Sequence, residues 1–107
     1  MQNKITKVLK AIADPTRREI FHALVVAATA MPITQISGQF QISRQGVTKH
    51  LKTLEEAGLV QIQTKGRERF CFADPLPLQE VNHWLKFYKR FWDNALSNLD
   101  RYLDNKL

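Results

Sequence analysis

The sequence predicts a mainly α-helical domain that carries one small β-hairpin, and two observations lead to this fold class. Apolar residues recur at spacings of three and four over most of the 107 residues, which is the period of helices that bury one face. Between residues 59 and 74 the period changes to two, as in strands, around a charged tip at residues 65–68. A chain of this length fits a single domain, which we place at residues 1–107.

Two helices are expected first, at about residues 3–13 and from residue 15 to about residue 30. The first carries one apolar stripe, formed by Ile5, Val8, Leu9 and Ile12. Asp14 is a suitable N-cap and Pro15 suits the first helical position, so the second helix should begin there. Residues 31–33 then form an extended connector, in which Ile33 turns inward.

Arg17 and Arg18 occupy the first turn of the second helix. Cations are unfavourable there, because the N-terminal end of a helix dipole is positive. We therefore expect each arginine to have an anionic partner. A carboxylate is favoured over a DNA phosphate.

Residues 34–57 are predicted to form a short helix, a tight turn and a second helix. Ser43 is a natural N-cap for that second helix, and Gly58 is a natural C′ residue. The turn of about three residues has the length used by helix-turn-helix units. Gly38 lies within the first helix, where glycine costs about 1 kcal/mol relative to alanine. This cost suggests that two helices cross closely at Gly38.

The second helix of this unit has two chemically different faces. Its apolar face should be buried and consists of Val47, Leu51 and Leu54. Its opposite face carries Gln45, Thr48, Lys49 and Lys52. Such a helix can lie in a DNA major groove with its N-terminal residues against base edges, and Gln45 and Thr48 can hydrogen-bond bases. The alternative is an ordinary solvated face, which is common on helix exteriors.

The hairpin should pack Phe70 and Phe72 inward with Val60 and Ile62, and should leave Cys71 on the other face. As a lone thiol, Cys71 is expected to be inert rather than a redox sensor. The charged tip can reach a phosphate or a minor groove, and this favours contacts from Lys65 and Arg67. A charged tip is more often only solvated, but its position directly after the helix-turn-helix favours a DNA contact by Arg67.

The last helix is expected at about residues 78–104, where glycine and proline are absent. Apolar residues alternate along it at four and three residues. At 1.5 Å per residue it would be about 39 Å long, longer than so small a domain can cover. We therefore expect a two-fold dimer in which this helix pairs with its copy or with the N-terminal helix. The alternative is that the aromatic residues form the domain's own core. The predicted dimer interface is Ile5, Val8, Leu9, Val81, Leu85, Tyr88, Trp92, Ala95, Leu99 and Tyr102.

The formal charge of +6 is unevenly distributed. Residues 1–69 contain eleven Lys/Arg and five Asp/Glu, whereas residues 70–107 contain five of each. A basic part joined to a neutral part suggests a polyanion-binding module with a separate interaction element. A single cysteine cannot form an internal disulfide, and no apolar run suits a membrane span or a signal peptide. We expect a cytoplasmic, nucleoid-associated protein with no membrane contact.

Catalytic motifs are missing from the sequence. It has no nucleotide-cradling glycine loop, no HExxH and no serine elbow. Glu55 and Glu56 are adjacent on a helix, so their carboxylates point about 100° apart and form no catalytic pair. We therefore predict neither an enzyme nor a cofactor.

Three segments, ADPTRREIFHAL, ISRQGVTKHLKTLEEAGLV and KGRERFCFAD, resemble the ArsR-type winged helix-turn-helix repressors of bacteria. The resemblance extends from about Lys7 to Tyr102. It implies a homodimeric repressor built on the first and last helices, with two recognition helices and two wings on a near-palindromic operator in double-stranded DNA. By position it implies DNA contacts from Ser43, Arg44, Gln45, Thr48, Lys49 and Arg67, to which the charge pattern adds Lys52 and Lys65.

The sequence departs from the metal-sensing members of that family. Their recognition helix or its approach carries a Cys-x-Cys pair, whereas GQFQISRQG contains no cysteine or histidine, and the last helix has only His83. A zinc-type site needs about four ligands, and His22, His50, His83 and Cys71 are scattered. We predict no metal, with control by an unidentified small-molecule or protein effector or by abundance. The alternatives are a winged helix that docks an acidic protein and a metal- or redox-responsive member with an unrecognised site.

Overall fold

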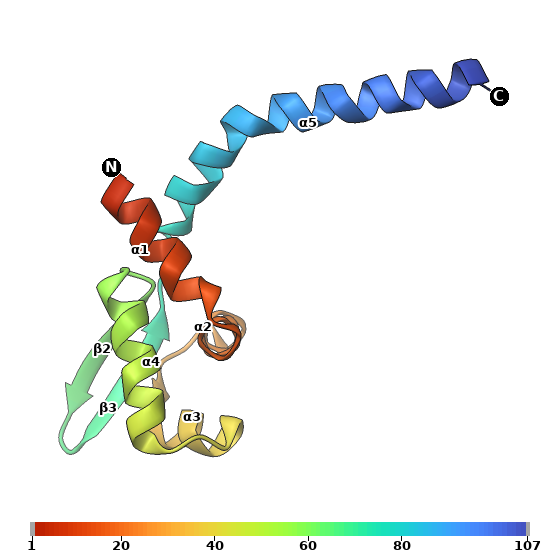
Figure 1. Ribbon diagram of the computed structural model, residues 1–107. Coiled ribbons are helices and arrows are strands. Elements are labelled where there is room, and N and C mark those ends of the chain that lie inside the picture. The colour runs from red at the N-terminus through yellow and green to blue at the C-terminus, as the bar shows by residue number, and fades with distance from the viewer. Residues whose placement is uncertain (1, 107) are drawn as a thin grey trace.

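The computed structural model of the protein describes residues 2–106. Within that range five helices and three strands follow one another as α1 (Gln2–Ala13), α2 (Pro15–Ala27), β1 (Met31–Pro32), α3 (Ile33–Phe40), α4 (Arg44–Glu56), β2 (Val60–Lys65), β3 (Glu68–Ala73) and α5 (Leu78–Lys106). Helices α1–α4 and the strands form one body, from which α5 projects as a long arm (Figure 1). The predicted fold class, mainly helical with a small hairpin wing, is confirmed.

The wing belongs to a three-stranded antiparallel sheet of order β1-β3-β2. Gly66, with φ of +62°, is the first residue of the two-residue turn between β2 and β3, where a type II′ hairpin requires glycine. Strand β1 was predicted only as a connector, but Met31 pairs with Cys71 and Pro32 with Phe70. A strand of two residues has no period, so no pattern in the sequence could reveal it.

The predicted inward face of the wing is confirmed for β2 but wrong for β3. Val60 is buried and Ile62 packs against the core, as predicted. Cys71 is 0% exposed, and its register partner Ile62 packs against the same core. Phe70 and Phe72, which alternate with Cys71 along β3, are only partly buried. The prediction that both phenylalanines point inward is therefore wrong. Antiparallel register pairs the inward Ile62 with Cys71, and this register is not visible in either strand alone.

The helix-turn-helix has the end caps that the sequence predicted. Ser43 accepts a hydrogen bond from the Gly46 amide at 3.1 Å, and the turn between α3 and α4 spans residues 41–43. At the other end Gly58 has φ of +78°. The amides of residues 58 and 59 donate to the α4 carbonyls of residues 55 and 54, each at 2.9 Å, which is the Schellman pattern. Both ends of α4 are therefore fixed by local hydrogen bonds.

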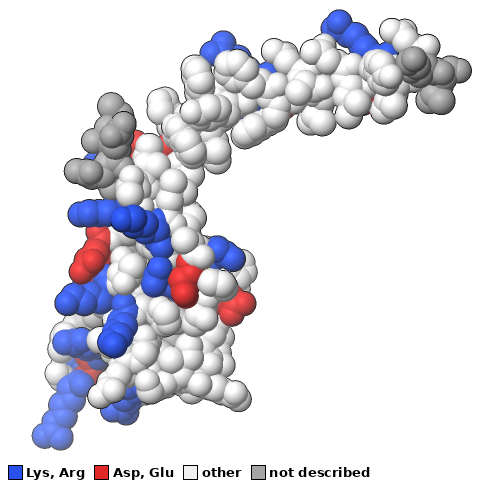
Figure 2. Space-filling view, viewed as in Figure 1, with Lys and Arg blue, Asp and Glu red and all other residues white. Residues whose placement is uncertain are grey.

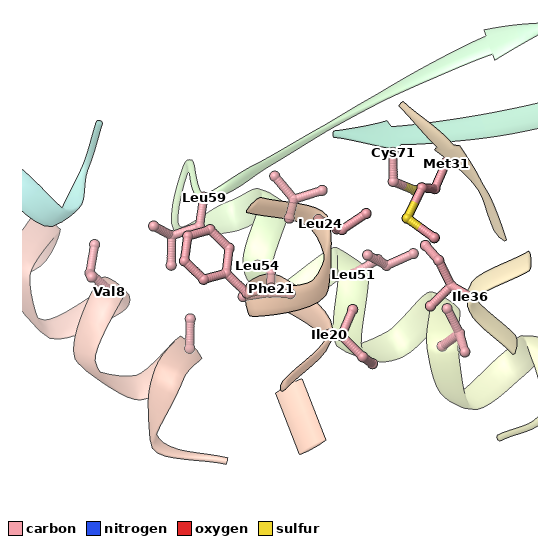
Figure 3. Packing of buried hydrophobic residues seen from close by; sticks show 13 residues of the cluster. Val8, Ile20, Phe21, Leu24, Met31, Ile36, Leu51, Leu54, Leu59 and Cys71 are labelled. Atoms are coloured by element: carbon pink, nitrogen blue, oxygen red, sulfur yellow. The ribbon is translucent and has the colours of Figure 1, made fainter. Parts of the chain in front are cut away.

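One hydrophobic core lies beneath α1, α2, α4 and the sheet, and Figure 3 shows side chains from all of them meeting there. Val47, Leu51 and Leu54, the predicted buried face of α4, are each 0% exposed. Val8 is 1% exposed within its own protomer. Its predicted place in the dimer interface is therefore wrong, because it has no surface left for a partner.

Helix α2 begins at the predicted cap. Pro15 is its first residue, and the Asp14 carboxylate accepts a hydrogen bond from the Arg17 amide at 2.8 Å. That hydrogen bond is the main cause that lowers the pKa of Asp14 below its ordinary value of 3.8. The helix ends at Ala27 rather than at about residue 30, because Ala28 adopts a left-handed conformation with φ of +54°.

The two arginines in the first turn of α2 have partners other than those predicted. Arg17 donates from Nε to the carbonyl of Ala11 at 2.6 Å and from Nη2 to that of Lys10 at 2.9 Å. Arg18 donates from Nη1 to the carbonyl of Ile12 at 2.7 Å. The preference for a carboxylate partner is therefore wrong for both arginines, and the phosphate alternative stays a prediction. Their partners lie at the negative end of the α1 dipole, which a sequence without an interhelical angle does not show.

Helix α5 leaves the body soon after it begins. Leu78 and Val81 pack against the core, whereas every described side chain from residue 82 to residue 105 is exposed. The protein therefore extends over 67 × 31 × 21 Å, with a radius of gyration of 18.8 Å. A compact chain of about 100 residues has a radius of gyration of about 13 Å. None of the described helices combines the length and the apolar character needed to cross a membrane.

Gly38 is not a point of close helix crossing, so that prediction is wrong. A Cβ atom built on Gly38 would have no neighbour within 4 Å. The crowded glycine is Gly46, whose Cβ would lie 2.7 Å from the Ile42 Cγ2 atom. The glycine in α3 therefore has no packing function among the described residues.

We expect Gly38→Ala to raise the free energy of unfolding by about 0.5–1 kcal/mol, because alanine loses less backbone entropy in a helix and meets no neighbour here. Urea denaturation at fixed protein concentration measures the change. Gly46→Ala is the matched control. It gives the same gain in backbone entropy, but its Cβ atom would clash with Ile42 and offset that gain. A less stable Gly38→Ala variant would contradict the open environment of Gly38.

Burial raises the pKa of the Cys71 thiol from 9.0 to about 11, and the Glu55 charge adds to the shift. Because the pKa is higher in the folded chain, the thiol's contribution to stability is complete below pH 9.0 and is lost as the pH rises towards about 11. The difference in unfolding free energy between the protein and Cys71→Ala should therefore shrink across this window. Denaturation at several pH values measures it, and a constant difference would contradict a buried, neutral thiol.

Candidate nucleic-acid interface

Helix α4 presents to solvent a face without large apolar side chains. Arg44, Gln45, Lys49 and Lys52 are exposed and Thr48 is half-buried. This face points outward because the opposite face of the helix is anchored in the core. Its groups are hydrogen-bond donors and acceptors and positive charges, which are the groups that read base edges and hold phosphates.

The wing tip lies at the same end of the molecule as the beginning of α4 and helix α3 (Figure 1). Lys65, Arg67 and Arg69 are exposed there. The six ladder pairs between β2 and β3 extend to Lys65 and Glu68, so the tip is supported up to its two-residue turn. A basic tip on a paired hairpin is held at a fixed distance from α4.

A groove of about 270 Å³ joins the helix-turn-helix to the wing. It is lined by Pro32, Ile33, Thr34, Arg44, Thr48, Arg67, Glu68 and Arg69. Pro32, the N-cap of α3, supplies no side-chain hydrogen bond to the first amides of that helix. Helix N-termini carry partial positive charge and bind anions, so the groove combines an uncapped helix end with three guanidinium groups.

Positive charge is concentrated on this part of the molecule. Figure 2 shows Lys and Arg along the side that carries α1, α4 and the wing tip, and fewer of them along α5. Within residues 2–106, none of Arg44, Arg67 and Arg69 forms a salt bridge, whereas Lys89 and Asp93 on α5 do so at 3.4 Å. Glu68 is the one carboxylate among the residues that line the groove. Unpaired guanidinium groups in one groove attract a polyanion.

Three of the residues predicted to contact DNA, Arg44, Thr48 and Arg67, come together in the groove. The other five lie outside it, and all are exposed: Ser43, Gln45, Lys49, Lys52 and Lys65. The hydroxyl oxygen of Ser43 is also engaged as the N-cap acceptor of α4.

Thr34 and Arg69 also line the groove and were not predicted as site residues. A signal for Arg69 existed, because in a period-two strand it alternates with Phe70 and follows Arg67 by two residues. No signal existed for Thr34, whose place beside the wing depends on how α3 packs against the sheet. Among the described residues, no group of three or more His, Cys, Asp or Glu side chains could hold a metal ion.

An exposed apolar face runs along α5. It comprises Trp84, Leu85, Phe87, Tyr88, Phe91, Trp92, Leu96, Leu99, Tyr102 and Leu103, with exposed fractions between 38% and 61%. Phe87 packs edge-on against Tyr88, with ring centroids 5.1 Å apart. On α1, Leu9 is 36% exposed and Ile5 is half-buried. Apolar patches of this extent on soluble proteins mark interaction surfaces.

Known proteins that are similar to this chain include helix-turn-helix proteins and transcriptional regulators. A family model described as "Helix-turn-helix domain" matches residues 12–63. The transcriptional repressor SdpR of Bacillus subtilis (strain 168) is 30% identical over 92 residues, which cover 86% of this chain and 100% of SdpR.

Solved structures show the same fold. The crystal structure of the ArsR family transcriptional regulator RHA00566 superposes with a TM-score of 0.77 at 25% identity, over 87% of this chain and 94% of that one. The homodimeric winged helix-turn-helix DNA-binding domain of Mb0332 from Mycobacterium bovis superposes with a TM-score of 0.62 at 19% identity, over 89% of this chain and 83% of that one.

Proposed function

The chain belongs to the ArsR-type winged helix-turn-helix family of DNA-binding transcriptional regulators, and we propose that it is a homodimeric repressor of a near-palindromic operator. Members of this family regulate transcription and are not enzymes. The relative SdpR is a repressor, and this supports repression rather than activation.

The observation that carries the proposal is the groove between α4 and the wing. Arg44 and Arg67 line this groove together with residues 32–34 at the uncapped start of α3, and Thr48 from the polar face of α4 lines it too. With α4 in a major groove, Gln45 and Thr48 meet base edges. The surrounding lysines and arginines then hold phosphates, which supply affinity without sequence choice.

The dimer is proposed from the apolar face of α5. Pairing two copies through α1 and α5 removes this face from water and gives an isologous, two-fold interface. The similar domain of Mb0332 is homodimeric. Two recognition helices related by a two-fold axis match two half-sites about one or two helical turns apart, and a bound dimer blocks RNA polymerase.

The proposal includes no metal requirement. The stretch that leads into α4, residues 38–46, contains no cysteine or histidine, and α5 has a single histidine, His83. Cys71 is buried with a raised pKa, so its thiolate is not offered as a ligand. We propose instead that an unidentified small-molecule or protein effector, or abundance alone, controls a cytoplasmic, nucleoid-associated repressor.

Selection of bound sequences from random duplex DNA tests the proposed function. We expect a two-fold symmetric motif. Gln45→Ala should relax the preference at one position of each half-site, at a cost of about 1–3 kcal/mol. Arg67→Ala should weaken binding to all sequences and reduce the slope of log affinity against log salt by about one.

Arg101→Ala is the matched control for Arg67→Ala, because it removes the same side chain from the exposed part of α5 and should leave the slope unchanged. Failure of the wild-type protein to bind any duplex at low ionic strength would refute the proposal. If Gln45→Ala lowered the affinity for operator and for random DNA equally, Gln45 would not read a base.

We expect Trp92→Glu to yield monomers in sedimentation, because it places a carboxylate in the apolar face where Trp92 is 45% exposed. Operator affinity should fall by about 100-fold or more, since each half-site is then bound separately. Arg90→Glu introduces the same carboxylate about 180° around the helix from the middle of that face, and should remain dimeric. A dimeric Trp92→Glu protein would refute the proposed interface.

A further inference from the structure

We propose that Arg17 is a positioning residue that sets the distance between the two recognition helices. By holding α1 and α2 at a fixed angle, it determines which spacing of operator half-sites the dimer accepts. This inference rests on the proposed function, because it needs a dimer formed through α1 and α5.

The contact consists of two hydrogen bonds from one planar group. Arg17 Nε lies 2.6 Å from the carbonyl oxygen of Ala11, and Nη2 lies 2.9 Å from that of Lys10. A guanidinium fork that holds two successive carbonyls fixes orientation as well as distance. A point charge on a flexible stem would fix only the distance.

These carbonyls are available because α1 ends there. The last four carbonyls of a helix have no partner within it, and a glycine at C′ commonly closes the end. Here α1 ends at Ala13 and is followed by Asp14 and Pro15, without a glycine. The guanidinium groups of α2 take the place of such a cap, and Arg18 adds a third hydrogen bond to Ile12 at 2.7 Å.

The backbone of Arg17 is held as firmly as its side chain. Its amide donates to the Asp14 carboxylate at 2.8 Å, and the Arg18 amide donates to the Asp14 carbonyl at 2.9 Å. The side chain of Arg17 therefore reaches α1 from a fixed point on α2. Backbone hydrogen bonds to Asp14 and side-chain hydrogen bonds to the end of α1 therefore both fix the corner where the two helices connect.

Packing alone constrains α1 less strongly. Its most deeply buried side chains are those of Val8 and Ala11, which are small. Together with the partly buried Ile12 they anchor the second half of α1 in the core, whereas none of residues 4–7 is buried. We infer that the hydrogen bonds of Arg17 fix the tilt of α1 relative to α2.

The corner lies between the part that dimerises and the part that contacts DNA. Helix α1 contacts α5 as well as α2 and α4. A change of angle at the corner is magnified at the recognition helix. A tilt of about 6° displaces a point about 30 Å away by about 3 Å, close to the rise of one base pair, about 3.4 Å.

The test compares Arg17→Lys with Arg18→Lys in the full chain. Both variants keep the charge. Lysine cannot form the paired contact of Arg17, but it can form the single contact of Arg18. Affinity is measured for the selected operator and for versions with one base pair added or removed between the half-sites. The ratio of these affinities is independent of the fraction of correctly folded protein.

We expect the wild-type protein and Arg18→Lys to prefer one spacing by about tenfold or more. Arg17→Lys should lose most of this preference while it remains dimeric in sedimentation and binds random duplex DNA as tightly as the wild type. Unchanged spacing preference in Arg17→Lys, or an equal loss in Arg18→Lys, would overturn the inference while leaving the proposed function intact. A wild-type protein without a symmetric motif or without a dimer would overturn both.

Discussion

Burial of one face of α4 is the constraint on which the rest of the structure depends. Val47, Leu51 and Leu54 lie in the middle of a core to which α1, α2 and the sheet also contribute. Rotation of α4 about its axis would expose these three side chains and bury charged ones, and both changes cost free energy. The polar face is therefore presented outward by hydrophobic packing, and the end caps fix where that face begins and ends.

Large apolar side chains are mostly buried in the body but exposed along α5. In the body the large apolar side chains of α2, α4 and the sheet meet in one core, whereas the apolar face of α5 is exposed. No single protomer of this shape can cover an arm that extends so far from its body. The neutral charge of residues 70–107 fits association with another copy, because like charges would not oppose it. Residues 1–69, which carry the basic excess, then remain available to bind a polyanion.

The features predictable from sequence were those that depend on neighbours within a few residues. Ser43, Asp14 and Gly58 act as caps because each reaches amides or adopts dihedral angles in its own turn of helix. The features that failed depend on distant elements. The inward face of β3 follows from its register with β2, and the burial of Val8 follows from the docking of α1. Neither the groove at Thr34 nor the short strand β1 has a periodic pattern of its own.

The arginines show most clearly why composition alone does not define a site. Arg17 and Arg18 contribute to the same basic excess as Arg44 and Arg67, and net charge alone does not separate the two pairs. The structure separates them by their partners. Carbonyls at the end of α1 accept hydrogen bonds from the first pair, so these side chains have partners within the fold. The second pair lines a groove that also contains Arg69 and the uncapped N-terminus of α3, and Glu68 is the one carboxylate in its lining. An anion from outside the protein would therefore stabilise the positive charges of this groove.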